Sequence, residues 1–234
     1  MEQSPFDPHR IDALVFDVIG TLVDEEPAWQ AAAARLASAA GLSQAAELAD
    51  RWAAALNDRM DAVIAGTAAW QPHRRLVAEA ASAAISSLGG TANAATIALA
   101  EGLDREYRAW PEVAEVTAAL RRSRLVAGVS NGDLDALARL ANTNAISWDV
   151  ALSTSAVHTF KPAPAAYRYA IDELALDPTR TLFVAAHPWD LRAAARHGFR
   201  TAYVARPGAE RPAPTDRFDV EAHPDLTALA TLLA

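Results

Sequence analysis

The chain contains no cysteine, which excludes disulfide bonds, thiolate metal sites and cysteine nucleophiles. It has no apolar run near the eighteen or so residues that a membrane-spanning helix needs. The N-terminal stretch, with Asp7, Arg10 and Asp12, lacks the basic region and apolar segment typical of a secretory signal. These absences predict a cytoplasmic protein without a membrane partner.

Positive charge is also scarce. The chain has 21 Lys and Arg against 29 Asp and Glu, a formal net charge of -8, which argues against a nucleic-acid partner. The basic clusters at residues 73–75 and 121–124 are predicted to be solvated helix faces. Lysine is the scarcest cation, because Lys161 is the only one beside twenty arginines. A position that keeps lysine in such a chain indicates a need for a compact ammonium group, with chance survival on the surface as the alternative.

What remains is a hydrophobic content of 52% over 234 residues, enough to fill a large core. Short apolar runs alternate with helix-like segments, an order that predicts a Rossmann-like α/β fold with a parallel sheet. The predicted strands are residues 13–16, 125–129, 150–152, 181–185 and 201–204. Residues 206–214, rich in Pro and Gly, are predicted to form a surface loop.

A long interval between the first two strands has helical rather than strand periodicity. Its apolar stripes are Trp29, Ala33, Leu36 and Ala40, then Leu48, Trp52 and Leu56, then Met60, Val63 and Ile64. We therefore predict a helical cap at residues 24–105, inserted into a core made of residues 1–23 and 106–234.

Polar residues follow the predicted strands at the edge where parallel sheets bind ligands. In chain order they are Asp17, Gly20, Thr21, Ser130, Asn131, Lys161, His187, Trp189 and Asp190. Each alone has an ordinary explanation as a turn or helix-cap residue. Together, and each at a strand end, they predict one convergent site.

Four stretches carry a family resemblance: "FDVIGTL", "VSNGD", "FKPAPAAY" and "FVAAHPWD". In this order they resemble the four signature motifs of the haloacid dehalogenase-like (HAD) superfamily, and the helical insertion resembles its cap domain. The pattern is most similar to the type II branch, the L-2-haloacid dehalogenases. This resemblance implies a small haloacid substrate and makes a homodimer plausible.

Ile19 distinguishes between the chemistries of this superfamily. HAD phosphatases carry a second Asp at this position as general acid and base, and they hold magnesium with acidic residues near the fourth motif. This chain has Ala185 and Ala186 there and keeps only Asp190, a poor donor set for a cation that prefers several oxygens. We therefore expect no metal and no cofactor, with Ile19 beside the substrate.

The resemblance implies covalent catalysis. Asp17 would attack the carbon that bears the halogen, displace halide with inversion and form an aspartyl ester, which water would then cleave. Lys161 would keep Asp17 ionised. Asp190, together with Lys161, would orient the hydrolytic water.

The resemblance assigns supporting roles to the remaining motif residues. Ser130 and Asn131 would position Asp17 and the substrate carboxylate, and Thr21 would hydrogen-bond Asp17. Tyr167 matches a family position that supports this network, although a core aromatic on a helix face explains it equally well.

Three positions depart from the dehalogenase pattern, which has Tyr where this chain has Ile19, Ser where it has Ala185, and Asn where it has His187. His187 could replace a lost hydrogen bond, as a base or as a halide donor, or be a simple turn residue before Pro188.

The family also uses a cap arginine to receive halide or carboxylate, for which Arg59 is the first candidate and Arg35 and Arg51 are alternatives. The aromatic candidates for the pocket wall are Trp52, Trp70 and Trp189. Two other functions stay open beside the dehalogenase: a HAD phosphatase with altered chemistry and a non-catalytic HAD-fold binding protein.

Overall fold

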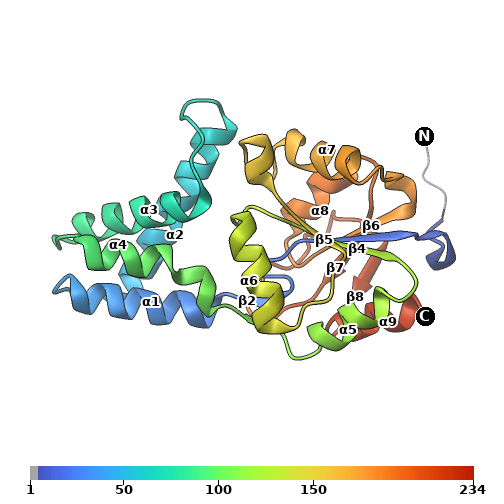
Figure 1. Ribbon diagram of the computed structural model, residues 1–234, viewed down its shortest axis with the longest axis horizontal. Helices are drawn as coiled ribbons and strands as arrows, with labels where there is room; N and C mark the ends of the chain where they lie inside the picture. The colour runs from blue at the N-terminus through green and yellow to red at the C-terminus, as the bar shows by residue number, and fades with distance from the viewer. Residues whose placement is uncertain (1–4) are drawn as a thin grey trace.

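The computed structural model describes residues 5–234. Its centre is a six-stranded sheet in the order β5-β4-β1-β6-β7-β8 (Figure 1). All neighbouring strands pair in parallel. The strands are β1 (Ala13–Phe16), β4 (Leu125–Ser130), β5 (Val150–Ser153), β6 (Thr181–Ala185), β7 (Arg200–Val204) and β8 (Val220–Ala222). This arrangement confirms the predicted α/β class.

Helices cover both faces of the sheet, which is why its strands are apolar without alternation. One face packs on α5 (Val113–Leu120), α6 (Leu134–Asn144) and α9 (Leu226–Leu232), and the other on α7 (Pro164–Glu173) and α8 (Pro188–Ala195). In β1, Leu14 and Phe16 enter the first core while Val15 enters the second. Both faces of the central strand are therefore dry.

The residues between Glu26 and Glu101 form a separate helical bundle beside this core (Figure 1). Its helices are α1 (Glu26–Ala39), α2 (Ala45–Ile64), α3 (His73–Ser87) and α4 (Ala94–Glu101). The predicted stripes supply its interior, where Leu36, Leu48 and Trp52 are fully buried. The rings of Trp29 and Trp52 stack with centroids 4.2 Å apart, which ties α1 to α2.

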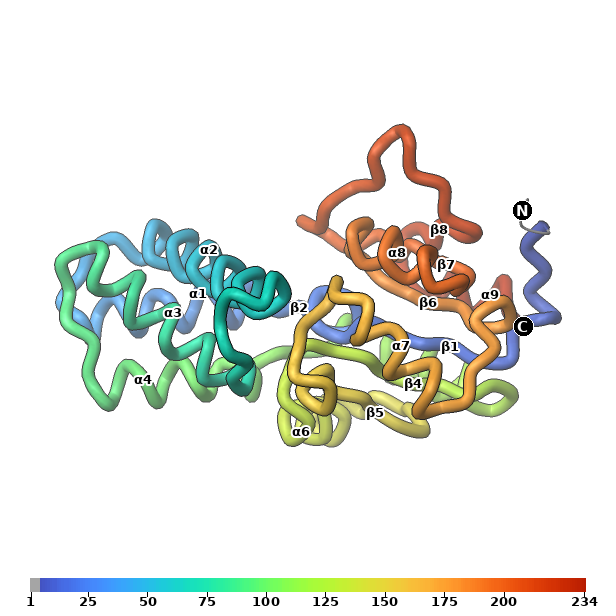
Figure 2. The backbone as a smooth tube through the Cα atoms, turned by 90° about the horizontal axis from the view of Figure 1, so that it is seen from above, coloured from blue at the N-terminus to red at the C-terminus, as the bar shows by residue number. Residues whose placement is uncertain are grey.

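A narrow two-stranded ribbon joins the bundle to the core, as Figure 2 shows near β2. The strands β2 (Val23–Asp24) and β3 (Arg108–Ala109) pair antiparallel. Short 3-10 helices occupy Pro8–Arg10, Leu103–Glu106, Thr154–Val157 and Pro178–Arg180. Because the chain crosses between the two units only through this ribbon, the cavity between them depends on how the ribbon is held.

Residues 207–214 contain no helix or strand and are exposed or half-buried, which confirms the predicted surface loop, but the first residue of the predicted segment, Arg206, is buried. This residue is only 6% exposed; its Nε donates to the carbonyl of Thr21 at 2.9 Å and its Nη1 pairs with Glu112 at 2.6 Å. Its guanidinium also lies over the ring of Trp110. The burial of Arg206 was not predicted, because a Pro- and Gly-rich segment gives no sign of the carboxylate and the backbone carbonyl that its first residue contacts.

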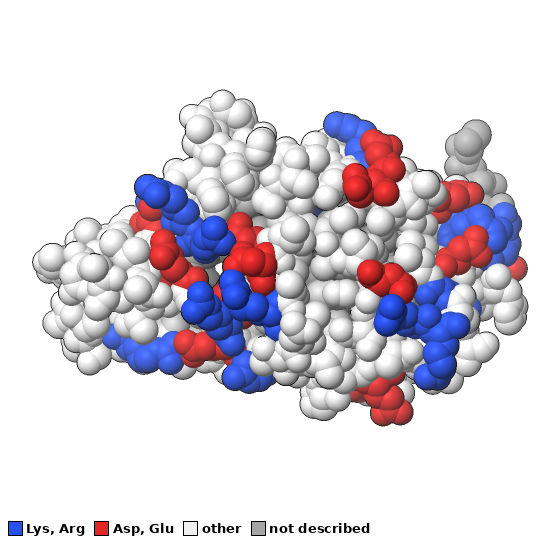
Figure 3. Space-filling view, in the orientation of Figure 1, with Lys and Arg blue, Asp and Glu red and all other residues white. Residues whose placement is uncertain are grey.

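The strands β2, β3 and β8 were not predicted, since each has only two or three residues and no readable periodicity. On the face drawn in Figure 3, basic and acidic side chains are interspersed. Among the described residues, no helix combines the length and apolarity needed to cross a membrane.

Candidate active site

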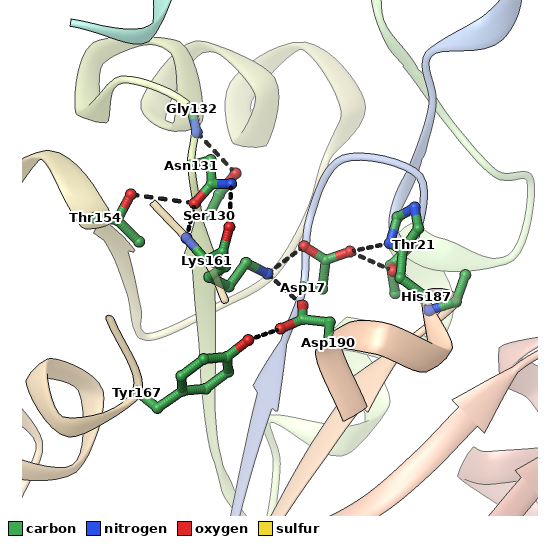
Figure 4. Close-up of polar contacts among 11 residues, drawn as sticks. Asp17, Thr21, Ser130, Asn131, Gly132, Thr154, Lys161, Tyr167, His187 and Asp190 are labelled. Carbon is green, nitrogen blue, oxygen red and sulfur yellow. Dashed lines mark hydrogen bonds and ion pairs between the residues drawn. The ribbon is translucent and has the colours of Figure 1, made fainter. Parts of the chain in front are cut away.

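Asp17 lies directly after β1, at the edge where the carboxyl ends of the strands meet. Its backbone N–H donates to the carbonyl of Val184 on β6 at 2.9 Å, and the residue is 5% exposed. The Thr21 hydroxyl donates to Asp17 Oδ2 at 2.7 Å, and the ammonium of Lys161 donates to Oδ1 at 2.6 Å (Figure 4). Both carboxylate oxygens are thus held.

Lys161 bridges two carboxylates. Its Nζ lies 2.6 Å from Asp17 and 2.5 Å from Asp190, and all three side chains are almost completely buried. The Tyr167 hydroxyl donates to the second oxygen of Asp190 at 2.5 Å. Buried charges are stable only when paired and hydrogen-bonded, which explains the single lysine as a structural and electrostatic requirement of this cluster.

The protonation states follow from this pairing. Burial by itself would raise the pKa of Asp17, but the charges and hydrogen bonds of Lys161 and His187 outweigh it and lower the pKa well below its usual range. Burial raises the pKa of Asp190. Burial also raises the pKa of Tyr167, so that its hydroxyl stays a donor. Asp17 is therefore held in its ionised form.

His187 completes the surroundings of the Asp17 carboxylate. Its Nδ1 lies 3.0 Å from Asp17 Oδ2. Burial alone would lower the pKa of His187, but the hydrogen bond and charge of Asp17 raise it. The ring passes close to Gly20, where a Cβ would lie 2.5 Å from its Cε1. Gly20 has a φ of 81°, so glycine serves both the turn and the approach of the ring.

The loop after β4 fixes the position of Lys161 rather than that of Asp17. The side-chain oxygen Oδ1 of Asn131 accepts from the backbone N–H of Lys161 at 2.7 Å and from the Thr154 hydroxyl at 3.3 Å. The Ser130 hydroxyl oxygen accepts from the Gly132 N–H at 3.1 Å, which leaves its own proton available. Both Ser130 and Asn131 line the cavity described next.

A cavity of about 280 Å³ separates the sheet edge from the helical bundle. Its core wall consists of Asp17, Ile19, Ser130, Asn131, Lys161, His187 and Trp189. Its opposite wall consists of Glu26, Trp29, Ala53, Leu56, Asn57, Met60 and His73, with Glu25 and Tyr107 beside the connecting ribbon. The predicted site residues Ile19, His187 and Trp189 therefore face the same space as Asp17.

Other predicted residues lie elsewhere. Thr21, Tyr167 and Asp190 are fully buried and do not line this cavity, so they act through Asp17 and Lys161. Neither Tyr167, predicted to contact substrate, nor Asp190, predicted to orient the hydrolytic water, faces this cavity. The reason is their position inside the core, one layer behind the two residues that they hold.

The predicted cap arginine is also absent from the cavity wall. Arg59 donates to the carbonyls of Ala55 and Glu79, because its position on α2 directs it along the bundle. Of the predicted wall aromatics, Trp52 is fully buried in the bundle and Trp70 packs against His158, with ring centroids 4.7 Å apart. Only Trp189 lines the cavity.

Several lining residues escaped sequence reasoning, among them Glu25, Trp29, Asn57 and Tyr107. His73 was assigned to a solvated helix face, and this is wrong: it lines the cavity. Asp133 accepts from the backbone N–H groups of His73 and Arg74 at 3.1 and 3.0 Å, which places the start of α3 against the core. These residues could be found only by knowing how the helical bundle is placed against the sheet core.

Among residues 5–234, no group of three or more His, Cys, Asp or Glu side chains is arranged to hold a metal ion. The place between Asp17 and Asp190 is taken by the Lys161 ammonium. A hard cation in the same place would face this charge, so the donor set does not fit magnesium.

Comparison with known proteins agrees with this geometry. The model of the haloacid dehalogenase-like hydrolase family matches residues 11–198. The chain belongs to the haloacid dehalogenase-like hydrolases. The crystal structure of the L-2-haloacid dehalogenase PA0810 is similar to this HAD-fold chain, with a TM-score of 0.85, 30% identity, and coverage of 95% of this chain and 98% of that chain.

A second HAD-fold structure, the defluorinating L-2-haloacid dehalogenase Rha0230, has a TM-score of 0.86 at 28% identity and covers 98% of this chain and 99% of its own. Among curated proteins, (S)-2-haloacid dehalogenase 4A of Burkholderia cepacia is 32% identical over 107 residues, which are 44% of this chain and 46% of that protein. The matched part thus spans about half the length of this curated relative.

Proposed function

We propose that this protein is a hydrolytic dehalogenase of small 2-haloalkanoic acids that forms an aspartyl ester on Asp17 and needs no metal. The observation that carries the proposal is the Lys161 ammonium, held 2.6 Å from Asp17 and 2.5 Å from Asp190. It keeps Asp17 ionised without a cation from solution. Ile19, in the same cavity wall, offers no acid for phosphoryl transfer.

In the first step Asp17 attacks the carbon that bears the halogen. A bond forms from a carboxylate oxygen to this carbon while the carbon–halogen bond breaks, and the halide leaves with the bonding electron pair. Ser130, whose hydroxyl proton is available, is placed to donate to the substrate carboxylate from the same wall as Asp17. Since Asp17 carries its charge in a site shielded from water, it is a stronger nucleophile than in solution.

The ester then presents a carbonyl that is already polarised. If Asp17 attacks through Oδ1, Oδ2 becomes the carbonyl oxygen and keeps its hydrogen bond from Thr21. If it attacks through Oδ2, the carbonyl oxygen is Oδ1 and keeps its hydrogen bond from Lys161. Either way a donor stabilises the negative charge that develops when water adds to the ester carbon.

His187 is the base for this second step. Esterification removes the negative charge of Asp17, which is what raises the pKa of His187, whereas burial and the charge of Lys161 lower it. The imidazole therefore loses its proton more readily once the ester has formed. Neutral His187 takes a proton from the attacking water, and returns it to the hydroxy-acid oxygen when the ester bond breaks.

Release of halide tests the proposal. The purified protein is incubated with chloroacetate, bromoacetate, fluoroacetate and L-2-chloropropionate, and free halide and hydroxy acid are quantified in equal amounts. Unchanged turnover in the presence of a chelator is expected. A folded protein that releases no halide from this panel contradicts the proposal, and magnesium-stimulated phosphate release from p-nitrophenyl phosphate would favour the phosphatase alternative instead.

Detection of a covalent intermediate distinguishes the proposed enzyme from a non-catalytic binding protein with the same fold. A mass increase on the peptide that contains Asp17, detected under single-turnover conditions, is expected only of the enzyme. Cytoplasmic location and a homodimer remain part of the proposal from sequence. Light scattering on the purified chain measures the oligomeric state, and a monomer at all accessible concentrations would contradict the dimer.

A further inference from the structure

In the proposed first step, the direction in which the halide leaves follows from the position of Asp17. Displacement at carbon is in line, so the halide departs on the side of the carbon away from the attacking carboxylate. Asp17 approaches from the sheet edge, and the far side of the cavity is formed by α1, α2 and α3 of the bundle. Whatever stabilises the departing halide in this conformation must therefore come from the bundle wall.

The arginines of the helices α1–α4 are all engaged away from this wall. Arg35 pairs with Glu106, Arg51 with Glu47, Arg74 with Asp135 and Arg75 with Glu79, while Arg59 donates to two backbone carbonyls. None of them lines the cavity. A charged receptor for the halide is thus absent from the bundle wall as the structure describes it.

Two neutral donors remain on this wall. Trp29 has its N–H committed to the carbonyl of Ala49 at 3.3 Å, and the other lining side chains of the bundle are apolar or acidic. The side chains of Asn57 on α2 and His73 at the start of α3 also carry N–H groups. These side-chain groups have no hydrogen-bond partner among residues 5–234, whereas the backbone N–H of His73 donates to Asp133. Burial lowers the pKa of His73, so at neutral pH its ring is an uncharged donor.

We propose that Asn57 and His73 form the receptor for the departing halide, two neutral N–H donors on the cavity wall opposite Asp17. This inference rests on the proposed dehalogenase function and names the residues that assist its first step. His73 is well placed for the role, because the hydrogen bonds from its backbone and that of Arg74 to Asp133 hold the start of α3 against the core. An edge-to-face contact with the ring of Phe160, with the ring centroids 6.3 Å apart, orients the imidazole of His73.

Neutral donors give this receptor a measurable signature. A hydrogen bond helps a leaving group in proportion to the charge that the group concentrates, so fluoride gains more than chloride and chloride more than bromide. Removing a donor should therefore slow ester formation most for fluoroacetate and least for bromoacetate. A purely structural defect would slow all substrates by the same factor.

The test uses single-turnover kinetics on His73→Phe and Asn57→Leu, with ester formation measured for each halogen. Loss of one neutral hydrogen bond predicts about a tenfold slower step with chloroacetate, a smaller loss with bromoacetate, and weaker inhibition by added chloride. His73→Asn and Asn57→Gln, which keep an N–H donor, should recover part of the rate. Asn57 is exposed, so its substitution leaves the core of the bundle intact.

Two further variants serve as comparisons. Arg75→Gln changes an exposed residue of α3 whose side chain is 66% exposed, and should alter no step. Tyr107→Phe removes a hydroxyl from the ribbon side of the cavity, and should show no dependence on the halogen. Equal losses for all halogens in the His73 and Asn57 variants, with unchanged chloride inhibition, overturn the inference while leaving the dehalogenase proposal standing. A wild-type protein that releases no halide overturns both.

Discussion

His187 and Asp17 meet through Nδ1 and Oδ2 at 3.0 Å, at the carboxylate oxygen that Lys161 does not hold. The Asp17 carboxylate thus lies between an ammonium group and an imidazole ring. Lys161 is buried between two carboxylates, whose charges raise its pKa against the effect of burial, so it stays charged. Burial lowers the pKa of His187, but the hydrogen bond and the charge of Asp17 raise it, so the protonation of His187 depends on the charge that Asp17 carries.

Asp17→Asn should abolish turnover, by at least about 10⁴-fold, because an amide is not a competent nucleophile here. The fold should survive, since Lys161 keeps Asp190 as its partner. Halide release and circular dichroism measure the two properties on the same sample. Retained activity in a correctly folded variant would disprove the assignment of the nucleophile.

His187→Gln should let the ester form but delay its hydrolysis, because glutamine keeps a hydrogen bond to Asp17 and cannot accept a proton from water. Loss of a general base predicts a decrease in steady-state turnover of about 10²–10⁴-fold. Intact-mass spectrometry should find the ester accumulated after mixing with substrate. A variant that shows no burst of halide and no adduct would place His187 in the first step instead.

The pH dependence of stability should also report on His187. Its pKa in the folded protein is raised by Asp17, so the folded state binds a proton more tightly than the unfolded chain, whose His pKa is about 6.5. This stabilisation is complete below the unfolded value and is lost as the pH rises through the folded one. The advantage of the wild type over His187→Gln in urea denaturation should therefore shrink as the pH rises above about 6.5. An advantage that grows with pH would contradict the ion pair.

Lys161→Met should destabilise the protein by about 3–5 kcal/mol, because it leaves two buried carboxylates without their common partner. It should also stop ester formation at neutral pH, since the pKa of Asp17 is no longer lowered by the ammonium. Lys161→Arg tests whether charge alone suffices: the larger, planar guanidinium does not fit between carboxylates that both lie within 2.6 Å of Nζ. Normal turnover in the arginine variant would refute the need for a compact cation.

Arg206→Met should lower stability by about 3–5 kcal/mol, because it leaves the partly buried Glu112 and the Thr21 carbonyl without their donor. Arg206 lies next to the ribbon of β2 and β3, which joins the helical bundle to the core. Because the variant would hold the bundle less firmly over the cavity, we also expect its KM for substrate to rise. Arg217→Gln, an exposed arginine in the same region of the chain, is the matched control and should change neither property. Similar denaturation midpoints for Arg206→Met and the wild type would count against this role of Arg206.

The strand ends were predictable because a parallel sheet brings its carboxyl ends to one edge. The apolar runs located β1, β4, β5, β6 and β7, and with them Asp17, Lys161 and Asp190, whose mutual contacts follow from strand order. The cavity-lining residues of the helical bundle could not be predicted in the same way. Its stripes predicted which residues are buried within it, yet Arg59 was expected at the cavity and His73 was not, because periodicity fixes the inner face of a helix and not which outer residue meets another unit.

By itself the sequence determined the fold class and indicated that Asp17 and the single lysine lie together at the strand ends, since these depend on hydrophobic pattern and on residue types at strand ends. Only the tertiary structure decided which residues reach the substrate space. It placed Tyr167 and Asp190 behind Lys161, turned His187 toward Asp17, and set Asn57 and His73 on the opposite wall. The physical reason is that contacts between the helical bundle and the sheet core depend on the ribbon that joins them and on the hydrogen bonds at the start of α3, and no local pattern in the chain encodes that placement.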